Sequence, residues 1–349
     1  MSKQLLLGDE AIAQAALDAG LSGVYAYMKK KMISVLLTAG LLAGTLAGNC
    51  VTVPAEEKAS DKIAVGALKG PTAMGMAQLL DDDSYDFTIA ASPDEIVPQI
   101  VQGNVDIAAV PSNLAAVLYQ KTQKNVSVLA VNTLGVLYLV ENGESIQSVE
   151  DLKGKTIYAS GKGATPEYAL EYVLSANGID PEKDVTIEYK SEHAEVVAAL
   201  ANDQTAAGLL PQPFVTTALM KNDSLRVALD LNQLWQDGVS DDSQLVTGVV
   251  VVRNDYLKEH EADVDAFMDA YQASVEFVNS DPDQAAKIIG AHDIIAEEVA
   301  KKAIPDCSIV FVEGEEMQTM LSGYLSTLEQ QNPEMVGGQL PDDDFYYAR

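Results

Sequence analysis

Two short glycine loops carry the residue types best suited to holding a polar ligand. Lys69-Gly70-Pro71-Thr72 follows the apolar segment 63–66, and Lys162-Gly163-Ala164-Thr165 follows the apolar segment 156–159. A strand, a glycine loop and a helix in that order leave backbone N–H groups at the helix start, where they can bind an anion or a polar group. At the second loop, Thr165 is predicted to cap a helix that has Pro166 at its first position.

The second loop matches neither of the common nucleotide-binding patterns. It lacks the Gly-Lys-Ser/Thr of a phosphate-binding Walker loop and the third glycine of a dinucleotide fingerprint. Taken alone, it is more simply interpreted as an ordinary turn between a strand and a helix.

The order of segments around these loops occurs twice in the chain. Each loop is followed by an Asp-x-Thr-Ile strand, then by a short apolar strand that ends at a proline, and then by a closing strand. The matching pairs are Asp86–Ile89 with Asp184–Ile187, Ile107–Asn113 with Ala207–Pro213, and Val126–Asn132 with Leu225–Asn232. This repeat predicts two βαβα lobes of one plan, with ligand-binding loops at the carboxyl ends of the strands.

Composition excludes several classes of function. The 349 residues carry a net charge of -30, so the chain repels nucleic acid, and we predict no nucleic-acid partner. The only arginines are Arg226, Arg253 and Arg349. The first two lie in apolar strands, so a bound anion is expected to meet Lys69, Lys162 or a helix start instead of an arginine fork.

The two cysteines and three histidines show no metal-ligand spacing, so we predict no metal site and no cofactor. No nucleophile pattern is present, so no catalytic residue is assigned. Cys307 is interpreted as a buried small hydrophobe. His193 is more simply a solvent-facing helix residue than a ligand contact. Tyr189, Phe214 and Trp235 could each stack on a ring, but aromatic residues of this kind are more often core.

The first 61 residues divide into three stretches. Residues 1–27 resemble the start of the alpha subunit of indolepyruvate ferredoxin oxidoreductase, through Leu5–Ala13, and are interpreted as an extraneous, misjoined start. Residues 28–49 read as a signal peptide with a lysine-rich beginning and a short apolar region. Cys50 resembles the lipidated cysteine of a bacterial lipobox, although Asn49 departs from that pattern. Cleavage without lipidation and a retained anchor are the alternatives. Residues 50–61 read as a flexible linker.

From residue 62, apolar strands alternate with segments of helical period, which predicts an α/β fold. Strands are expected at 63–67, 85–90, 105–110, 126–132, 136–140, 156–159, 225–231, 245–253 and 309–312, with a further one beginning near Asp184. Helices are expected at 73–80, 93–102, 112–121, 166–176, 255–279, 282–289, 294–303 and 314–330, with a further one beginning at Ser191. The segments Leu134–Val140 and Leu245–Arg253 are predicted to cross between the lobes. The first lobe would then hold 62–134 with 246–349, and the second 135–245.

Taken together, five motifs over 62–347 resemble the substrate-binding proteins of ABC transporters. The nearest branch comprises the nitrate, alkanesulfonate, taurine and thiamine-pyrimidine-precursor binders. The motifs are Lys69–Thr72, Val110–Asn113, Asp151–Leu170, Leu209–Pro213 and Leu245–Gly248. The resemblance implies a type II periplasmic-binding-protein fold, with two lobes, two crossings and hinge closure on a small molecule. It also implies an exported, lipid-anchored monomer in the periplasm or on the outer face of the cytoplasmic membrane. Its partner would be a permease driven by an ATPase.

Carried onto this sequence, the resemblance places ligand contacts in both lobes. The implied residues are Lys69, Gly70, Pro71, Thr72, Ser92, Ser112, Asn113, Thr133, Lys162, Gly163, Ala164, Thr165, Tyr189, Gln212, Pro213 and Thr247. These loops are rich in backbone donors and poor in charge, which favours a small polar ligand that is weakly anionic or heteroaromatic. An enzyme or precursor-synthesis protein on the same fold, and a sensor receptor, remain as alternatives.

Overall fold

The chain folds into strands and helices that alternate through most of its length. We describe a computed structural model of residues 62–203, 205–238 and 244–349, all of which belong to the unit Ser60–Arg349. The strands are β1 (Ile63–Leu68), β2 (Tyr85–Ala90), β3 (Ile107–Pro111), β4 (Val126–Leu134), β5 (Leu137–Asn142), β6 (Thr156–Ser160), β7 (Thr186–Lys190), β8 (Ala207–Pro211), β9 (Leu225–Asp230), β10 (Val246–Arg253) and β11 (Ile309–Val312).

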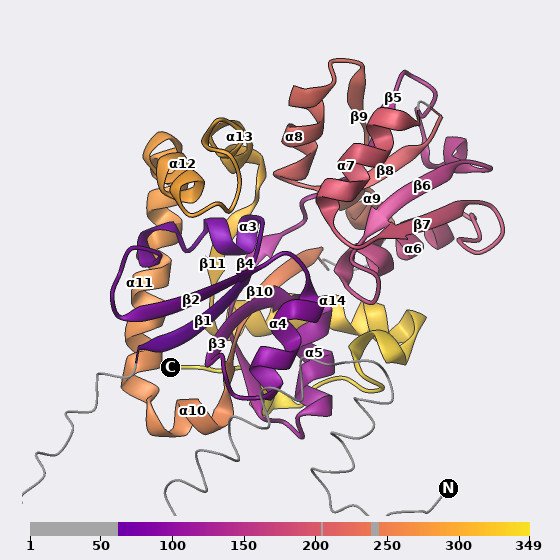
Figure 1. Cartoon of the computed structure of the whole chain (residues 1–349). Coiled ribbons are helices and arrows are strands. Elements are labelled where there is room, and N and C mark those ends of the chain that lie inside the picture. The colour runs from indigo at the N-terminus through magenta and orange to yellow at the C-terminus, as the bar shows by residue number, and fades with distance from the viewer. Residues whose placement is uncertain (1–61, 204, 239–243) are drawn as a thin grey trace, which may run out of the picture. The chain divides into compact units, whose positions relative to one another are not determined.

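The strands form two sheets of matching topology (Figure 1). The first sheet has the order β11-β4-β10-β3-β1-β2, and the second has the order β7-β6-β8-β5-β9. In the first, β1 is parallel to β2 and β3, and β10 is antiparallel to β3 and β4. In the second, β6 is parallel to β7 and β8, and β5 is antiparallel to β8 and β9. Apart from the edge strand β11, the two sheets are the same plan, which confirms the predicted repeat.

Helices cover both sheets. Those grouped with the first sheet are α3 (Pro71–Met74), α4 (Pro93–Val101), α5 (Ser112–Lys121), α10 (Asn254–Glu259), α11 (Glu261–Ser280), α12 (Pro282–Ala291), α13 (Glu297–Ala303) and α14 (Gly314–Gln331). Of these, α12 packs on α11, and α13 packs on α12. Those of the second are α6 (Thr165–Ala176), α7 (His193–Asn202), α8 (Phe214–Lys221) and α9 (Leu231–Gly238). Short 3-10 turns occur at Ala77–Leu79, Val149–Leu152, Ile304–Asp306, Pro333–Val336 and Asp343–Phe345. We call each sheet with its helices a lobe.

Three helix predictions need correction. The helix expected at 73–80 is the single turn α3 followed by a 3-10 turn. The helix expected at 255–279 is two helices, α10 and α11, which meet at His260. Residues Leu231–Gly238, where no helix was predicted and a strand was expected to reach residue 231, form α9 and bury Trp235. Local patterns place element boundaries least well, because caps and single-turn breaks depend on packing from elsewhere.

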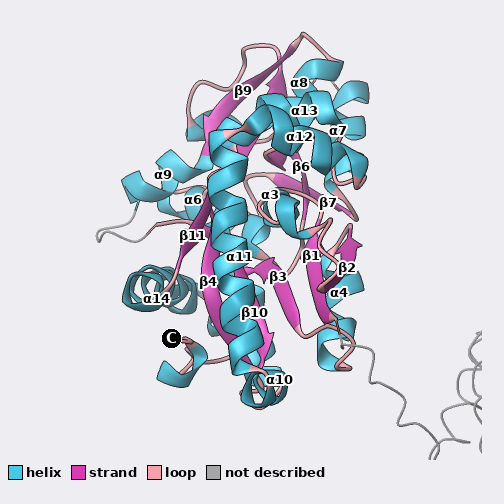
Figure 2. Ribbon diagram, turned by 90° about the vertical axis from the view of Figure 1, so that its left-hand side faces the viewer, coloured by secondary structure: helices cyan, strands magenta, loops and turns pink. Residues whose placement is uncertain are grey.

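Strand β10, predicted to cross between the lobes, instead lies wholly in the first sheet, where it pairs with β3 and β4. It shows why the sheets are buried on both faces. Its four consecutive valines, Val249–Val252, are all buried. Successive side chains of a strand point to opposite faces, so Val249 and Val251 join the core beneath α4, α5 and α14. The other two join the core beneath α11, the long helix that runs along the other face of the sheet (Figure 2).

One of the apolar cores spans both lobes. Trp235 of α9 and Tyr324 of α14 are both fully buried, and their ring centroids lie 5.3 Å apart. At the first crossing, Gly135 leaves room for Asn232, because a Cβ atom there would lie 2.1 Å from the Asn232 Oδ1 atom. The lobes are therefore packed against each other through α9 and α14, and next to the first crossing.

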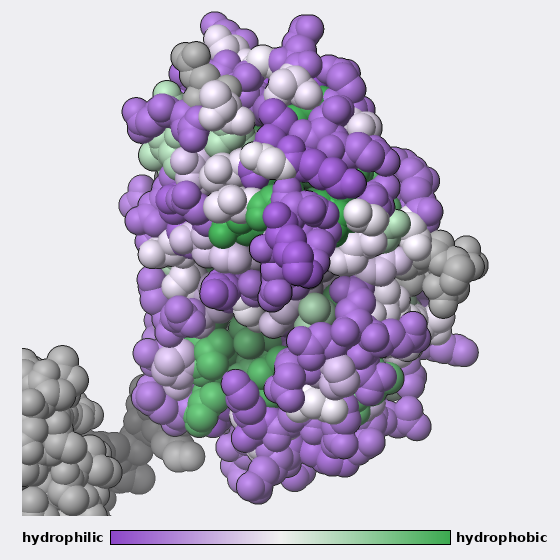
Figure 3. Space-filling view, turned by 90° about the vertical axis from the view of Figure 1, so that its right-hand side faces the viewer, coloured by the Kyte–Doolittle hydropathy of each residue, from purple (hydrophilic) through white to green (hydrophobic). Residues whose placement is uncertain are grey.

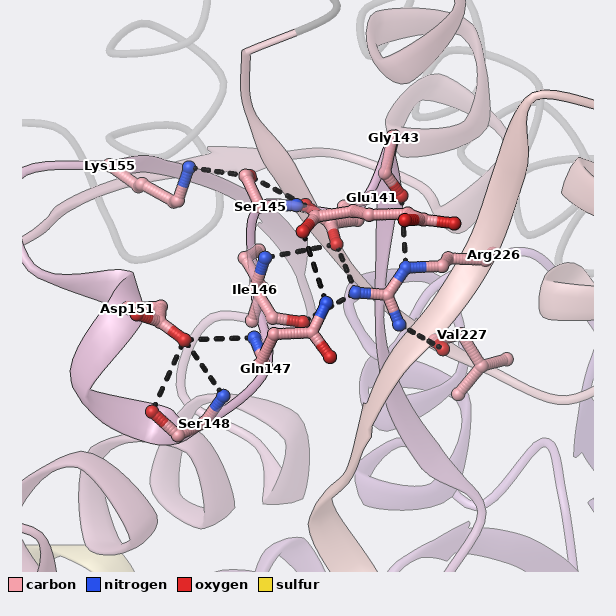
Figure 4. A network of polar contacts seen from close by, with 11 residues as sticks. Glu141, Gly143, Ser145, Ile146, Gln147, Ser148, Asp151, Lys155, Arg226 and Val227 are labelled. Carbon is pink, nitrogen blue, oxygen red and sulfur yellow. Dashed lines mark hydrogen bonds and ion pairs between the residues drawn. The ribbon is translucent and has the colours of Figure 1, made fainter.

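A buried ion pair closes the edge of the second sheet (Figure 4). The Glu141 side chain is 2% exposed and pairs with Arg226. Its carboxylate also accepts hydrogen bonds from the backbone of Ser145 and Ile146, and from the Ser145 hydroxyl. This confirms that Arg226 is a structural strand residue; Arg253 likewise pairs with Asp106.

The carboxyl-terminal tail packs back on the first lobe. The Tyr347 N–H donates to the Val128 carbonyl at 2.9 Å. Arg349 pairs with Asp269 and Glu313.

Among the described helices, none has the length and hydropathy needed to span a bilayer. The predicted stretch 1–27, the signal peptide 28–49, Cys50 and the linker 50–61 lie outside the described residues.

Candidate ligand cavity between the lobes

A cavity of about 80 Å³ lies where the strand ends of the two lobes meet. Leu68, Pro111 and Pro211, the last residues of β1, β3 and β8, all line it. This is the edge at which open α/β sheets bind ligands. The other lining residues are Lys69, Pro71, Thr72, Thr133, Val136, Leu137, Thr165, Pro166, His193, Gln212, Phe214 and Thr247.

The charge on this lining is simple. Lys69 is its only charged side chain, and none of the described residues that line it carries a carboxylate. Four threonines, Gln212 and His193 supply the remaining polar groups. The lining therefore offers one positive charge and several neutral donors on a largely apolar wall.

Several lining side chains are already fixed by hydrogen bonds to their own lobe. The Thr72 hydroxyl donates to the Leu68 carbonyl at 2.9 Å, and the Thr247 hydroxyl donates to the Leu134 carbonyl at 2.6 Å. Gln212 Oε1 accepts from the N–H and the hydroxyl of Thr216 at 3.2 and 2.8 Å. No hydrogen bond is made by Gln212 Nε2 to any described residue, so both its protons remain for a ligand.

A buried polar seam joins the lobes beside the cavity. The Thr165 hydroxyl of α6 donates to Asn113 Oδ1 of α5 at 3.2 Å and lies 3.3 Å from Ser112 Oγ. Asn113 Nδ2 donates to the Gly163 carbonyl at 3.3 Å. All three side chains are buried. The prediction that Thr165 is the N-cap of α6 is therefore wrong. The N-cap residue is Ala164, and the threonine side chain crosses to the other lobe instead.

The second glycine loop is less open to an anion than its sequence indicates. The Gly163 N–H donates to the carboxylate of Glu167, a buried residue in the first turn of α6. A negative charge therefore already occupies a donor that the sequence offered to a ligand. Lys162 is exposed, and its Nζ atom lies 5.6 Å from the centre of the Tyr189 ring. Neither Gly163 nor Lys162 lines the cavity.

The structure brings only part of the expected ligand set together. Seven of the expected residues line the cavity: Lys69, Pro71, Thr72, Thr133, Thr165, Gln212 and Thr247. Nine do not: Gly70, Ser92, Ser112, Asn113, Lys162, Gly163, Ala164, Tyr189 and Pro213. The sequence analysis did not predict the apolar residues of the lining. Most of them end a strand or begin a helix at this edge of the sheets, and that position is the feature by which they could have been found.

His193 corrects the expectation that it faces solvent. It is the first residue of α7, and its ring lines the cavity. Its Nδ1 atom is hydrogen-bonded to Ser160 Oγ at the end of β6, and its ring centroid lies 4.9 Å from that of Phe214. Burial lowers the pKa of His193 to about 4, so the imidazole is neutral at physiological pH.

Two lobes of one topology around a small cavity at their strand ends define a two-lobed ligand-binding protein. The profile of a family described as the periplasmic substrate-binding protein of phosphonate ABC transporters matches residues 71–294. That span is more than half of the chain, so the chain belongs to this family of solute-binding receptors for ABC importers. Proteins of this family bind solutes for transport in the periplasm and are not enzymes, and their partners are a small-molecule ligand and a permease.

Solved structures agree with this assignment. An ABC transporter protein from Parabacteroides distasonis is 27% identical with a TM-score of 0.69, over 82% of this chain and 99% of that one. The periplasmic aliphatic sulphonate binding protein SsuA from Escherichia coli is 16% identical with a TM-score of 0.64, over 82% and 92%. The alkanesulfonate-binding protein SsuA from Xanthomonas axonopodis pv. citri, bound to MOPS, is 17% identical with a TM-score of 0.63, over 80% and 94%. The last two likenesses show the fold alone. Among curated proteins, none matches the chain.

Proposed function

We propose that this receptor captures a small organic anion with a single negative charge and a short apolar body. The observation that carries the proposal is the charge on the cavity lining. Lys69 is the one charged group there, and none of the described lining residues bears a carboxylate that would repel an anion. Lys69 is exposed at the rim of the cavity, and its one positive charge balances one negative charge on a ligand, which would be costly to bury without a partner.

The size and the wall of the cavity limit the body of this ligand. A volume of about 80 Å³ is room for only a few water molecules, since each fills ~30 Å³ in the liquid. A molecule of a few heavy atoms is the expected cargo. Leu68, Val136 and Phe214 supply apolar wall, and Gln212 Nε2 supplies neutral donors. Short alkanesulfonates combine these properties, and two proteins of the same fold bind sulfonates.

We further propose that the residue boundaries of the lobes are 62–134 with 246–349 and 135–245. In this proposal the lobes close on the ligand as a hinge, and the seam of Thr165 with Asn113 forms on closure. Lipid anchoring at Cys50 and a monomeric receptor complete the proposal. On the face drawn in Figure 3, most residues are hydrophilic and the hydrophobic ones lie in separate patches, which supports a monomer for that face.

The two lysines of the paired glycine loops provide the test. We expect ethanesulfonate to bind the purified protein in isothermal calorimetry, and Lys69→Ala to weaken that binding about tenfold or more, as for a lost hydrogen bond to a charged group. Lys162→Ala is the matched control, because it removes an exposed lysine outside the cavity and should leave the dissociation constant unchanged.

A wider panel separates the competing ligand classes. Ethylphosphonate, nitrate, an aminopyrimidine and an uncharged sulfone are titrated in the same way. Tightest binding of the aminopyrimidine or the sulfone, or equal affinity of the wild type and Lys69→Ala for ethanesulfonate, would refute the anion proposal. Chemical turnover of any bound compound would favour the alternative that the protein is an enzyme on the same fold.

A further inference from the structure

We propose that His193 determines ligand specificity from the second lobe by donating a hydrogen bond to the bound anion from its Nε2 atom. Its imidazole is neutral, and Ser160 holds the ring in the form that carries the proton on Nε2. The contact with a ligand rests on the proposed anion-binding function. The tautomer does not, because it follows from hydrogen bonds within the protein. Lys69 then contacts the anion from the first lobe and His193 from the second.

The tautomer follows from an accounting of donors and acceptors. Ser160 is 2% exposed, and its hydroxyl makes no hydrogen bond to any described residue other than His193 Nδ1. If Nδ1 carried the proton, the serine hydroxyl would accept from it and its own buried proton would lack an acceptor. Leaving such a group unpaired is costly. The serine hydroxyl therefore donates to Nδ1, and the imidazole proton lies on Nε2.

The ring has little freedom to move away from the cavity. His193 begins α7 directly after the bend that follows β7, so the backbone places its side chain at the strand-end edge. Ser160 fixes one ring nitrogen from β6, and Phe214 packs against the ring from α8 at 4.9 Å. Three elements of the second lobe thus orient one donor. Preorganised donors of this kind lose little entropy when a ligand binds.

The pairing of a serine with a histidine does not make a nucleophile here. Ser160 is buried and is not among the residues that line the cavity, so a ligand does not reach its hydroxyl. No carboxylate among the described residues is hydrogen-bonded to His193 to orient it as a base. The pair acts in recognition, with Ser160 as a positioning residue and His193 as the contact.

The tautomer is measured first, on the unliganded protein. Proton–nitrogen correlation spectra of the imidazoles, with His260 and His292 assigned by substitution, report which nitrogen of each ring is protonated. At neutral pH we expect His193 to be uncharged with its proton on Nε2. A proton on Nδ1, or a charged ring, would overturn the inference whatever the ligand proves to be.

The ligand contact is measured with ethanesulfonate as the probe. His193→Phe keeps a ring against Phe214 but removes the donor, so we expect binding to weaken by about 10- to 100-fold, the range for a hydrogen bond to a charged group. His193→Gln places an amide donor at a similar reach and should restore part of the affinity. His260→Phe is the matched control, because His260 stacks on Tyr256 at the α10–α11 junction.

The variant of the positioning residue separates orientation from contact. Ser160→Ala should move the His193 tautomer toward a mixture and weaken binding less than His193→Phe. Wild-type affinity in His193→Phe would overturn the contact, and so would equal losses in the phenylalanine and glutamine variants. If none of ethanesulfonate, ethylphosphonate and nitrate binds the wild type, the anion proposal and the ligand contact both fail. The spectra of the unliganded protein still decide the tautomer.

Discussion

Replacing Glu141 by glutamine tests how far one buried carboxylate stabilises the second lobe. The carboxylate accepts hydrogen bonds from the Ser145 N–H at 3.1 Å, from its hydroxyl at 2.7 Å and from the Ile146 N–H at 3.0 Å, and it pairs with Arg226. Each oxygen therefore serves a backbone N–H. An amide NH₂ in place of either oxygen would face those donors with donors of its own.

The expected loss follows from the bonds that cannot be remade. Hydrogen bonds to a charged group contribute about 1.5–3 kcal/mol each, and breaking a buried ion pair costs about 3–5 kcal/mol. Because Arg226 is partly exposed and can turn toward water, we expect Glu141→Gln to lower the free energy of unfolding by about 3 kcal/mol. For a folded unit of the size of Ser60–Arg349, that corresponds to a fall of about 6 °C in melting temperature.

The pH dependence has a definite sign. Burial by itself raises the pKa of Glu141, but the hydrogen bonds from Ser145, Ile146 and Arg226 outweigh it, so the pKa lies below its ordinary value. A carboxyl whose pKa is lower in the folded state than in the unfolded state stabilises fully above the unfolded pKa. That contribution is lost as the pH falls through the folded pKa. The difference between wild type and variant should be constant near neutral pH and shrink below about pH 4.5.

The assay is urea unfolding followed by circular dichroism at several pH values. Asp283→Asn is the control, because Asp283 and Lys301 form an ion pair with side chains 62% and 57% exposed. Such pairs contribute only about 0–1 kcal/mol. A loss in Glu141→Gln no larger than in Asp283→Asn would refute the reasoning, as would a difference from wild type that persists unchanged at acid pH.

Three further predictions concern the seam, the core and the first crossing. Thr165→Val leaves Asn113 Oδ1 without its buried donor, so ethanesulfonate should bind about tenfold more weakly in calorimetry; unchanged affinity would mean that the seam does not stabilise the binding form. Cys307 is free and buried, and burial raises the pKa of its thiol, so a disulfide reagent should react with it only as fast as the protein unfolds. Rapid reaction in native buffer would contradict this. Gly135→Ala should lower the free energy of unfolding in urea by about 1–3 kcal/mol, because its Cβ would clash with Asn232. Wild-type stability would show that the backbone at the first crossing, or Asn232, can move to make room.

The sequence by itself determined the architecture. Apolar strands, helical periods and the repeated order of segments predicted two lobes of one plan, and the sheets have matching orders. The valines of β10 show why this works: a continuous apolar run must be buried on both faces, whatever the distant packing. The burial of Cys307 and the structural role of Arg226 were predicted for the same reason, since burial follows from local hydropathy.

Only the tertiary structure decided which side chains meet at the cavity. Lys69 and Lys162 occupy equivalent loops, yet the first lines the cavity and the second lies over Tyr189. His193 was predicted to face solvent, but Ser160 and Phe214, which are distant in sequence, turn it inward. Local patterns fix which face of an element is apolar. They do not fix the partner of a polar side chain, because that partner is brought into contact by the packing of another element.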